Sequence, residues 1–320
     1  DANKKGDVAP RSFLSVIDAA RPQIAVGSSG RLELARWVAS PDNPLTMRVI
    51  VNRVWQYHFG KGLVATSSNF GRQSPPPSHP ELLDWLARDF IDHRLSLKHL
   101  HRRIMSSAVY QLGSTHNADN AQRDEANRLY WRFDRQRMDA ETLRDSLLAV
   151  SGSLERGSGG RHPFKPTEEL KYTQGNPFTE TFEHNRRSVY LMNPRLNKHP
   201  FMALYDGPDT NKSTEQRAAS TVSLQSLHML NSAFIEQQAA AFAARISAAT
   251  SDVAGRLQLA YELALARPPD ETERARATGY LQTLTADLQS EGRPLTEAER
   301  LAWTSFARAL LASNEFIYVD

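Results

Sequence analysis

Residues 43–90 read NPLTMRVIVNRVWQYHFGKGLVATSSNFGRQSPPPSHPELLDWLARDF, and this stretch decides the fold. Pro44 suits the first turn of a helix, where a missing backbone N–H costs nothing. From residue 45 to residue 59 apolar side chains fall on every side, a pattern typical of a helix that is buried all round. Gly60 and Gly62 supply the left-handed backbone that ends a helix. The stretch therefore predicts a buried helix over 44–59.

Three polar residues lie within this expected helix, namely Arg48, Asn52 and Arg53. Arg48, Asn52 and Trp55 are spaced so that they share one face. An arginine keeps its charge, so its burial requires carboxylate or carbonyl partners. Two interpretations stay open. These side chains form a buried arginine–carboxylate network that fixes how other helices dock, or they face a pocket that binds a ligand.

A second helix is expected after residues 75–77, three prolines that favour extended backbone. Ser78 and Glu81 fit a capping box with Ser78 at the N-cap. Apolar residues then recur at helical spacing as far as Phe90. The pattern predicts a helix over 80–92, with His79 in its first turn.

The rest of the chain is predominantly helical by the same criteria. Asp139 is the expected N-cap of a helix over 140–150, and helices fill the chain after residue 224. Among these, a helix over 271–284 is expected to start at Asp270 as its N-cap, with Glu273 three residues on. Glycines and prolines exclude a long helix over 151–186, where we expect an irregular loop. The bulky runs 129–133 and 187–191 predict two short strands that pair with each other. The predicted fold class is all-α, with at most one small two-stranded β element.

Three regions are expected along the chain. Residues 1–30 are an N-terminal arm or linker remnant, 31–223 form a helical core, and 224–320 form a C-terminal helical part packed on the same body. The sequence starts at Asp1 without an initiator Met or a signal peptide. We therefore expect an internal piece of a longer protein.

Composition narrows the function classes. The 39 Lys and Arg against 36 Asp and Glu give a formal charge of +3, too mild to indicate nucleic-acid binding. No apolar run is long enough to predict a membrane span. The chain contains no cysteine, so it cannot attach a c-type haem itself. The sequence signatures of serine hydrolases, nucleotide-binding enzymes and zinc enzymes are missing.

The motifs of the chain resemble those of the planctomycete PSD domain family, a family of unknown function. The matching pieces include Asn43-Pro44-Leu45, Asn52-Arg53, Phe59-Gly60, Pro77-Ser78-His79-Pro80-Glu81, Arg137-Met138-Asp139, Tyr205-Asp206-Gly207 and Glu315-Phe316-Ile317. The resemblance implies the C-terminal region of a long exported bacterial protein, in the periplasm or at the cell surface. It also implies upstream domains as partners, one of them cytochrome c-like and haem-binding. The resemblance does not imply a reaction, because none is established for the family. Since the chain has no cysteine for haem attachment, we expect no cofactor in this chain.

Candidate catalytic groups are few. Glu141 and Asp145 are one helical turn apart and could act as a carboxylate pair. The alternative is that they pair with arginines such as Arg48 or Arg53. Asp206 and His79 are the other candidates for a catalytic acid or base.

Candidate metal ligands are equally few. Asp206, Asp209 and Asn211, followed by Ser213, offer the hard oxygen atoms that Ca²⁺ prefers, although the spacing is not that of an EF-hand. The alternative is an Asx-rich turn whose carboxylates accept backbone N–H groups and Arg217. Residues 93–105 predict an amphipathic helix with a basic outer face. Its histidines two residues apart point to different sides, which argues against a two-histidine metal site.

Two functions from different classes follow. The first is a helical interaction module that docks on upstream domains of a haem-containing exported protein. The second is a polysaccharide-active enzyme domain that binds acidic or sulfated glycans through arginines and stacks sugars on aromatic rings. The candidate stacking residues are Trp55, Trp85, Tyr172 and Tyr190. The candidate ligand-binding residues are Arg48, Asn52, Arg53, Trp55, His79, Arg187, Tyr205 and Arg217. Arginines that converge with a carboxylate in an open cleft favour the enzyme, whereas paired arginines favour the module.

Overall fold

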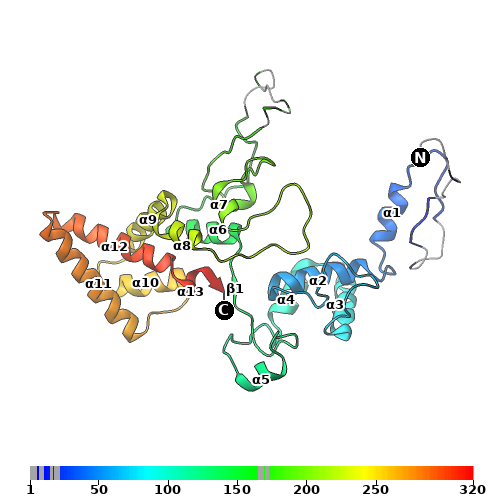
Figure 1. Cartoon of the computed structure of the whole chain (residues 1–320), viewed down its shortest axis with the longest axis horizontal. Helices are drawn as coiled ribbons and strands as arrows, with labels where there is room; N and C mark the ends of the chain where they lie inside the picture. The colour runs from blue at the N-terminus through cyan, green and yellow to red at the C-terminus, as the bar shows by residue number, and fades with distance from the viewer. Residues whose placement is uncertain are drawn as a thin grey trace. The chain divides into compact units, whose positions relative to one another are not determined.

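The computed structural model describes residues 6, 11–14, 17, 22–164, 169, 173, 175–176 and 178–319. Over these residues the chain is mainly helical, with thirteen α-helices and one two-stranded antiparallel sheet (Figure 1). The predicted all-α class is thereby confirmed. The chain divides into two compact units between Asp134 and Arg135. The expected region boundaries at residues 30 and 223 stay predictions.

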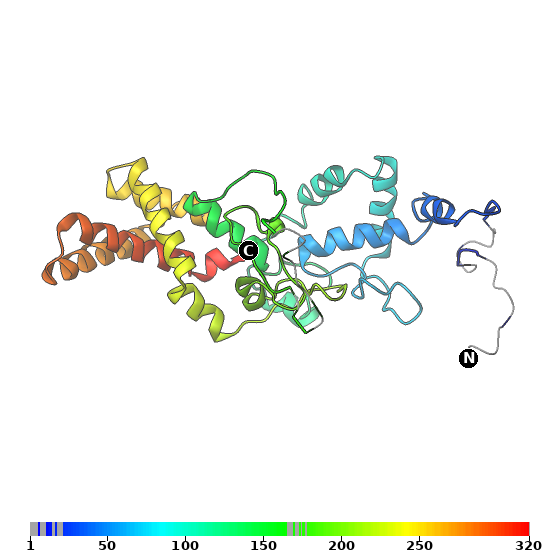
Figure 2. The ribbon, with the colours of Figure 1, turned by 90° about the horizontal axis from the view of Figure 1, so that it is seen from above.

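The first unit contains five helices, drawn from blue to green in Figure 1. They are α1 (Arg31–Val38), α2 (Thr46–Phe59), α3 (Pro80–Asp92), α4 (Leu97–Met105) and α5 (Ala118–Arg123). The helices α2, α3 and α4 pack on one another, and Figure 2 shows the same group from above. The apolar positions that predicted α2 and α3 form this core, which includes Val51, Trp55, Leu86, Phe90 and Leu100.

The helix α2 is not buried all round, because one of its faces is exposed. Asn52 and Trp55 lie in the interior, as their shared face predicted. Arg53 is exposed, and Tyr57 is 86% exposed. The expectation of a fully buried helix is therefore wrong for the face that carries Arg53 and Tyr57. Because Arg53 and the hydroxyl of Tyr57 stay in water, neither group is desolvated when the chain folds.

The start of α3 also differs from the capping-box prediction. The N-cap residue is His79, and no side chain caps the helix. Ser78 turns away and donates from its hydroxyl to the carbonyl oxygen of Leu63 at 3.3 Å. Pro80 at the first helical position removes one of the N–H groups that a cap would satisfy. A tertiary contact of Ser78 with the turn after α2, residues 60–64 (the glycine turn), thus replaces the local cap.

The second unit contains the remaining helices and the sheet. The elements are β1 (Gln136–Arg137), α6 (Ala140–Ser151), the 3-10 helix η2 (Ser188–Tyr190), α7 (Pro200–Leu204), α8 (Ser223–Asn231), α9 (Ala233–Ala249), α10 (Val253–Leu265), α11 (Glu271–Ser290), α12 (Leu295–Leu311), α13 (Asn314–Ile317) and β2 (Tyr318–Val319). The core forms where α9 packs against α6 and α12, with α11 beside α12. Its deepest side chains include Leu147, Phe242, Ile246 and Leu311.

Two predicted helix starts in this unit are confirmed. Asp139 accepts a hydrogen bond from the amide of Thr142 at 2.7 Å and begins α6. The carboxylate of Asp270 accepts a hydrogen bond from the backbone amide of Glu273 at 2.7 Å. The carboxylate of Glu273 in turn accepts a hydrogen bond from the backbone amide of Asp270 at 2.8 Å. This reciprocal pair is a capping box, which fixes the first turn of α11.

The sequence correctly predicted a single pair of short strands, but it predicted them in the wrong segments of the chain. The two strands are β1 and β2, with Gln136 opposite Val319 and Arg137 opposite Tyr318. The run 129–133 is a turn, because Asn127 and Tyr130 take left-handed backbone with φ of 49° and 55°. The side chain of Asn127 accepts from the amide of Trp131 at 2.8 Å and holds this turn.

The other expected strand, 187–191, contains η2 instead. Beyond Ser151, the last residue of α6, no α-helix is found among the residues the structure describes between 152 and 186, in agreement with the predicted irregular loop. A helix with the length and apolarity needed to cross a membrane is not found among the described residues.

Candidate functional site

The candidate residue Arg48 lies at the edge of a pocket in the first unit. The pocket has a volume of about 310 Å³ and is lined by α2, the start of α3 and the prolines at 75–77. Arg48 Nε donates to Asp84 Oδ1 at 2.6 Å, and Arg48 also donates to the carbonyl oxygen of Pro44. The hydrogen bond between the two side chains raises the pKa of Arg48 and lowers that of Asp84. Arg48 thus has a carboxylate partner, but it is Asp84 and not Glu141 or Asp145.

Asn52 is completely buried and holds the chain that follows α2. Its Oδ1 accepts from the amide of Val64 at 2.8 Å, and its Nδ2 donates to the carbonyl oxygen of Val64 at 3.1 Å. Gly62 makes this approach possible, because a Cβ there would lie 2.6 Å from Asn52 Nδ2 and 2.6 Å from the oxygen of Val64. The amide of Asn52 therefore acts as a clamp on backbone.

Trp55 and His79 lie near one tyrosine. Trp55 Nε1 donates to the hydroxyl of Tyr130 at 2.8 Å, and its ring stacks on Phe59 in the core. His79 lies with its ring centroid 5.8 Å from that of Tyr130 and its Nδ1 3.0 Å from the hydroxyl of Ser78. Trp55 is 2% exposed, so its ring face is occupied by protein.

In the second unit, Asp206 joins three parts of the chain. Its carboxylate accepts from Arg137 Nη2 at 2.7 Å, from the amide of Ser220 at 2.8 Å and from the hydroxyl of Ser220 at 2.8–2.9 Å. Burial opposes ionisation of Asp206, but the hydrogen bonds from Ser220 and the charge of Arg137 outweigh it and hold the pKa of the carboxyl below its usual value. Asp206 stays ionised and serves as an anchor.

Tyr205 precedes this anchor and points into the core. Its hydroxyl donates to the carbonyl oxygen of Gln225 at 3.0 Å, and burial raises its pKa to about 12. The guanidinium of Arg137 lies 5.9 Å from the centre of the Tyr205 ring. Arg137 thus contacts both Tyr205 and Asp206, and sequence reasoning did not single it out as a site residue.

The carboxylates of α6 pair with arginines of the same unit. Arg217 Nη1 lies 2.6 Å from Glu141 Oε2, and Arg187 Nε lies 3.8 Å from Asp145 Oδ2. The expected pairing of Glu141 and Asp145 with Arg48 or Arg53 is therefore wrong. The expected pairing of Arg217 with Asp206 is also wrong, because Arg137 occupies that carboxylate. Among the predicted site residues, Glu141 pairs with Arg217, whereas Arg187 lies near Asp145.

The candidate calcium ligands Asp209 and Asn211 form an Asx turn. Asp209 Oδ1 accepts from the amide of Asn211 at 3.0 Å, and Asn211 Nδ2 donates to the carbonyl oxygen of Arg195 at 3.3 Å. Asp206 is held elsewhere by Arg137 and Ser220. This arrangement agrees with the alternative of an Asx-rich turn.

Among the candidate stacking residues that the structure describes, Trp85 is the most exposed. It is 51% exposed on α3, with the guanidinium of Arg103 at 5.7 Å from its ring centre. Tyr172 lies outside the described residues. The helix α4 also carries the exposed basic side chains Lys98 and Arg102. The predicted basic outer face of this helix is present.

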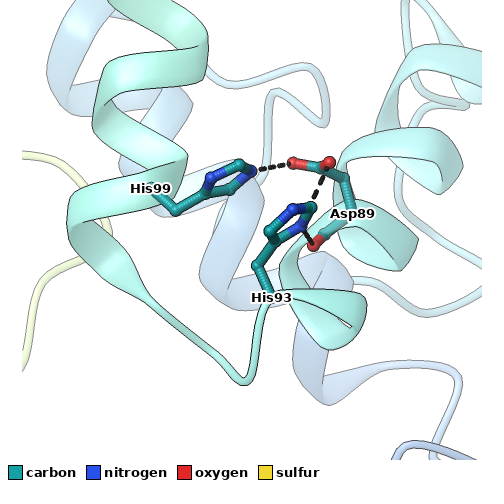
Figure 3. A group of neighbouring side chains, drawn as sticks. All are labelled: Asp89, His93 and His99. Carbon is teal, nitrogen blue, oxygen red and sulfur yellow. Dashed lines mark hydrogen bonds and ion pairs between the residues drawn. The ribbon is translucent and has the colours of Figure 1, made fainter.

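A cluster that sequence reasoning missed lies where α3 meets α4. Asp89, His93 and His99 each place one oxygen or nitrogen atom within 4.8 Å of the other two (Figure 3). His99 Nε2 is 2.8 Å from Asp89 Oδ2, and His93 Nδ1 is 3.4 Å from Asp89 Oδ1. The signal available in the sequence was the spacing of Asp89 and His93, one helical turn apart, with His99 following after a short break.

The fold is predominantly helical, and the carboxylates Asp84, Glu141 and Asp206 each pair with an arginine. The chain belongs to the family PSD1, described as a protein of unknown function (DUF1553), which matches residues 30–281. The resemblance drawn from the motifs is confirmed at the level of the family. No curated protein and no solved structure matches the chain.

Proposed function

We propose that this chain is a helical interaction module of a larger exported protein, docking on the domains that lie upstream of it there. The single observation that carries the proposal is the engagement of the candidate catalytic carboxylates. Glu141 and Asp206 each hold an arginine, at 2.6 Å and 2.7 Å. A general acid needs a pKa near the operating pH, whereas that of Asp206 lies below its usual value. These groups favour architecture over acid–base chemistry.

The helix α8 supplies the docking surface in this proposal. Its inner side carries the buried residues Gln225 and Met229. Three leucines on its outer side, Leu224, Leu227 and Leu230, are exposed. They follow one another at a spacing of three residues and share a side of the helix. An exposed apolar stripe rimmed by polar residues is typical of a protein–protein contact.

Binding to the upstream part of the parent protein tests this proposal. The variant Leu224→Lys/Leu227→Lys should weaken binding at least about tenfold, because it places two charges in an apolar contact. Leu295→Lys is the matched control, since Leu295 is an exposed leucine of the same unit. Calorimetric titration of the purified upstream segment with this chain measures the affinity. Absence of binding, or equal effects of the two variants, would contradict the proposal.

The exported setting is a separate part of the proposal. Its support is the family resemblance, which implies a cytochrome c-like haem domain upstream of this chain. Fractionation of native cells with an antibody against this chain tests the location. A periplasmic or surface fraction is expected, and recovery with cytosolic markers would contradict it.

A second candidate function is action on acidic or sulfated polysaccharides, as a polysaccharide-active domain. The observation that favours it is Trp85, which is half-exposed with the guanidinium of Arg103 5.7 Å from its ring centre, while α4 also exposes Lys98 and Arg102. Sugar rings stack on open aromatic faces, and sulfates or carboxylates pair with guanidinium groups. This face, and not Arg48 or Arg187 with their carboxylate partners, is the best platform for such a polymer.

Binding of sulfated and carboxylated polysaccharides at low and physiological salt tests this candidate. Trp85→Ala should weaken binding at every salt concentration, whereas Arg102→Ala should weaken it most at low salt. Arg123→Ala, an exposed arginine of the same unit, is the control. Release of reducing ends would further identify an enzyme. No binding by the unaltered chain would remove this candidate and leave the interaction module untouched.

A further inference from the structure

We propose that Asp89, His93 and His99 form a binding site for a divalent transition-metal ion, with Zn²⁺ as the best match. The proposal is independent of the docking function. It rests on how the end of α3 and the start of α4 bring two imidazoles and one carboxylate together (Figure 3).

The turn between the helices sets this geometry. The helix α3 ends at Asp92, and Arg94 and Leu95 both take left-handed backbone, with φ of 55° and 57°. The chain therefore reverses within a few residues, and the amide of Leu95 bonds back to the carbonyl oxygen of Phe90 at 2.9 Å. Two consecutive left-handed residues other than glycine are costly. Such strain commonly persists where it positions functional side chains.

The start of α4 is fixed as well. Ser96 caps the helix by accepting from the amide of His99 at 3.3 Å. Leu100, the next residue, is completely buried in the core of the unit. His99 is thereby held on the first turn, facing α3. The backbone of all three residues is fixed before any ion binds, which lowers the entropic cost of assembling a metal site.

The two imidazole rings are parallel and offer their nitrogen-bearing edges to one carboxylate. Their centroids are 3.6 Å apart with an interplanar angle of 10°. Asp89 lies opposite both edges, as Figure 3 shows. The nitrogen–oxygen distances are 2.8 Å for His99 and 3.4 Å for His93. Ligand atoms of a tetrahedral zinc site are about 3.3 Å apart, given zinc–ligand bonds of about 2.0 Å. Small side-chain rotations would therefore bring all three groups to bonding distance of one ion.

The donor set selects the class of ion. Imidazole suits Zn²⁺, Cu²⁺, Ni²⁺ and Fe²⁺, whereas Mg²⁺ and Ca²⁺ prefer oxygen atoms alone. Three protein ligands leave a position for water. His93 is 46% exposed and His99 23% exposed, so the ion would be reached from solvent. The Asp89 side chain is only 9% exposed, which keeps the anionic ligand out of bulk water.

The ring nitrogens that would bind the ion are the same nitrogens that make the hydrogen bonds of the cluster. His93 Nδ1 donates to the backbone oxygen of Asp89 at 2.8 Å, and His99 Nε2 faces the carboxylate at 2.8 Å. Each imidazole binds an ion through a nitrogen without a proton, so each proton moves to the other ring nitrogen. This exchange of tautomer requires no further group.

A neighbouring cation distinguishes a metal site from a purely structural cluster. Arg103 Nη2 lies 3.6 Å from Asp89 Oδ1 and competes with an ion for the carboxylate. In a structural cluster, removal of Arg103 would only weaken the packing around Asp89. In a metal site, removal of the positive charge of Arg103 increases the affinity of the site for the metal ion, because two cations near one carboxylate repel each other.

Titration of the whole, chelator-treated chain with Zn²⁺ against a chromogenic competitor tests the proposal, together with the visible absorption of bound Co²⁺. One ion per chain is expected. His99→Ala and Asp89→Asn should each lower affinity at least about 100-fold, since second-shell changes alone cost 10- to 100-fold. Asp89→Asn keeps the size and one hydrogen-bond acceptor, so it preserves the fold if His99→Ala does not. Arg103→Gln should bind Zn²⁺ more tightly than the unaltered chain.

Two controls make the outcome decisive. His116→Ala removes an exposed histidine of the same unit that is not part of the cluster, and should leave affinity unchanged. His101→Ala removes the partner of His58, whose Nε2 lies 2.8 Å from His101 Nδ1. Loss of binding in His101→Ala with full binding in His99→Ala would place the ion elsewhere and overturn the proposal. Absence of stoichiometric binding by the unaltered chain would also overturn it.

Discussion

The backbone amide of Ser188 donates a 2.7 Å hydrogen bond to Asp145 Oδ1, across 43 residues of chain. The preceding residue of α6, Arg144, is buried and donates to the carbonyl oxygens of His184 at 2.5 Å and Arg186 at 3.3 Å. Two adjacent residues of one helix thus hold the end of the irregular segment. A guanidinium suits this role because its several N–H groups satisfy carbonyls that no strand or helix pairs.

Replacement of Arg144 should release this segment. Arg144→Met keeps the apolar stem but leaves two carbonyl oxygens unsatisfied, and should lower the free energy of unfolding by about 2 kcal/mol. Limited trypsin digestion should then cut faster at Arg156 and Arg161. Arg187→Met is the control, since Arg187 is exposed and lies 3.8 Å from its carboxylate. Equal digestion of both variants would show that Arg144 does not hold the segment.

The ion pair between Arg137 and Asp206 should contribute more than the surface pairs of the same unit. Asp206→Asn tests its charge without backbone strain, because asparagine tolerates the left-handed φ of 59° found there. The variant leaves the largely buried guanidinium of Arg137 without its counter-charge, and should cost about 3 kcal/mol. Urea unfolding measures it. Asp209→Asn, in the neighbouring Asx turn, should leave the urea midpoint nearly unchanged, because that carboxylate is open to water.

In the first unit, Asn52 is expected to be essential for the glycine turn. Asn52→Ala leaves the amide and carbonyl of Val64 buried without partners, and should destabilise the unit by about 2–3 kcal/mol. Gly62→Ala should also destabilise the unit, because the added methyl group would clash with Asn52. Thermal unfolding followed by circular dichroism checks both. Arg53→Ala, one residue along the helix and exposed, should leave the melting temperature unchanged.

Acid should weaken the start of α11. The hydrogen bond from Arg267 lowers the pKa of Glu273 to about 2, from the ordinary value of 4.5. A depressed carboxyl pKa contributes stability that is present above about 4.5 and is lost as the pH falls towards about 2. The pair is partly exposed, so its contribution should be about 1 kcal/mol or less. Glu273→Gln should reduce the loss of stability in this window, measured against Glu297→Gln. An unchanged pH profile would contradict the assignment.

Signals that act within one helical turn could be predicted from the sequence. The caps at Asp139 and Asp270 depend on groups three residues away, and both are present. The capping prediction at Ser78 was wrong because Leu63, which is distant along the chain, offers its carbonyl oxygen instead. The strand prediction over 129–133 was wrong because bulky residues there fill a turn, which the side chain of Asn127 holds.

The partners of the charged residues could not be predicted. Arg137 and Asp206 are 69 residues apart, and Arg217 and Glu141 are 76 apart. Periodicity says which face of a helix is polar, but not which distant carboxylate meets it. The cluster of Asp89, His93 and His99 was missed for a related reason. Its assembly depends on the left-handed pair at Arg94 and Leu95, which no residue preference indicates.

The pairing of β1 with β2 has a consequence for biosynthesis. Gln136 finds its partner Val319 only after nearly the whole second unit has left the ribosome. At about 5–20 residues per second, that interval lasts on the order of 10–40 seconds. The first unit has its own core and can fold early, while the beginning of the second must wait for its final turn of helix and strand. A chaperone that shields nascent chains would therefore act on the second unit.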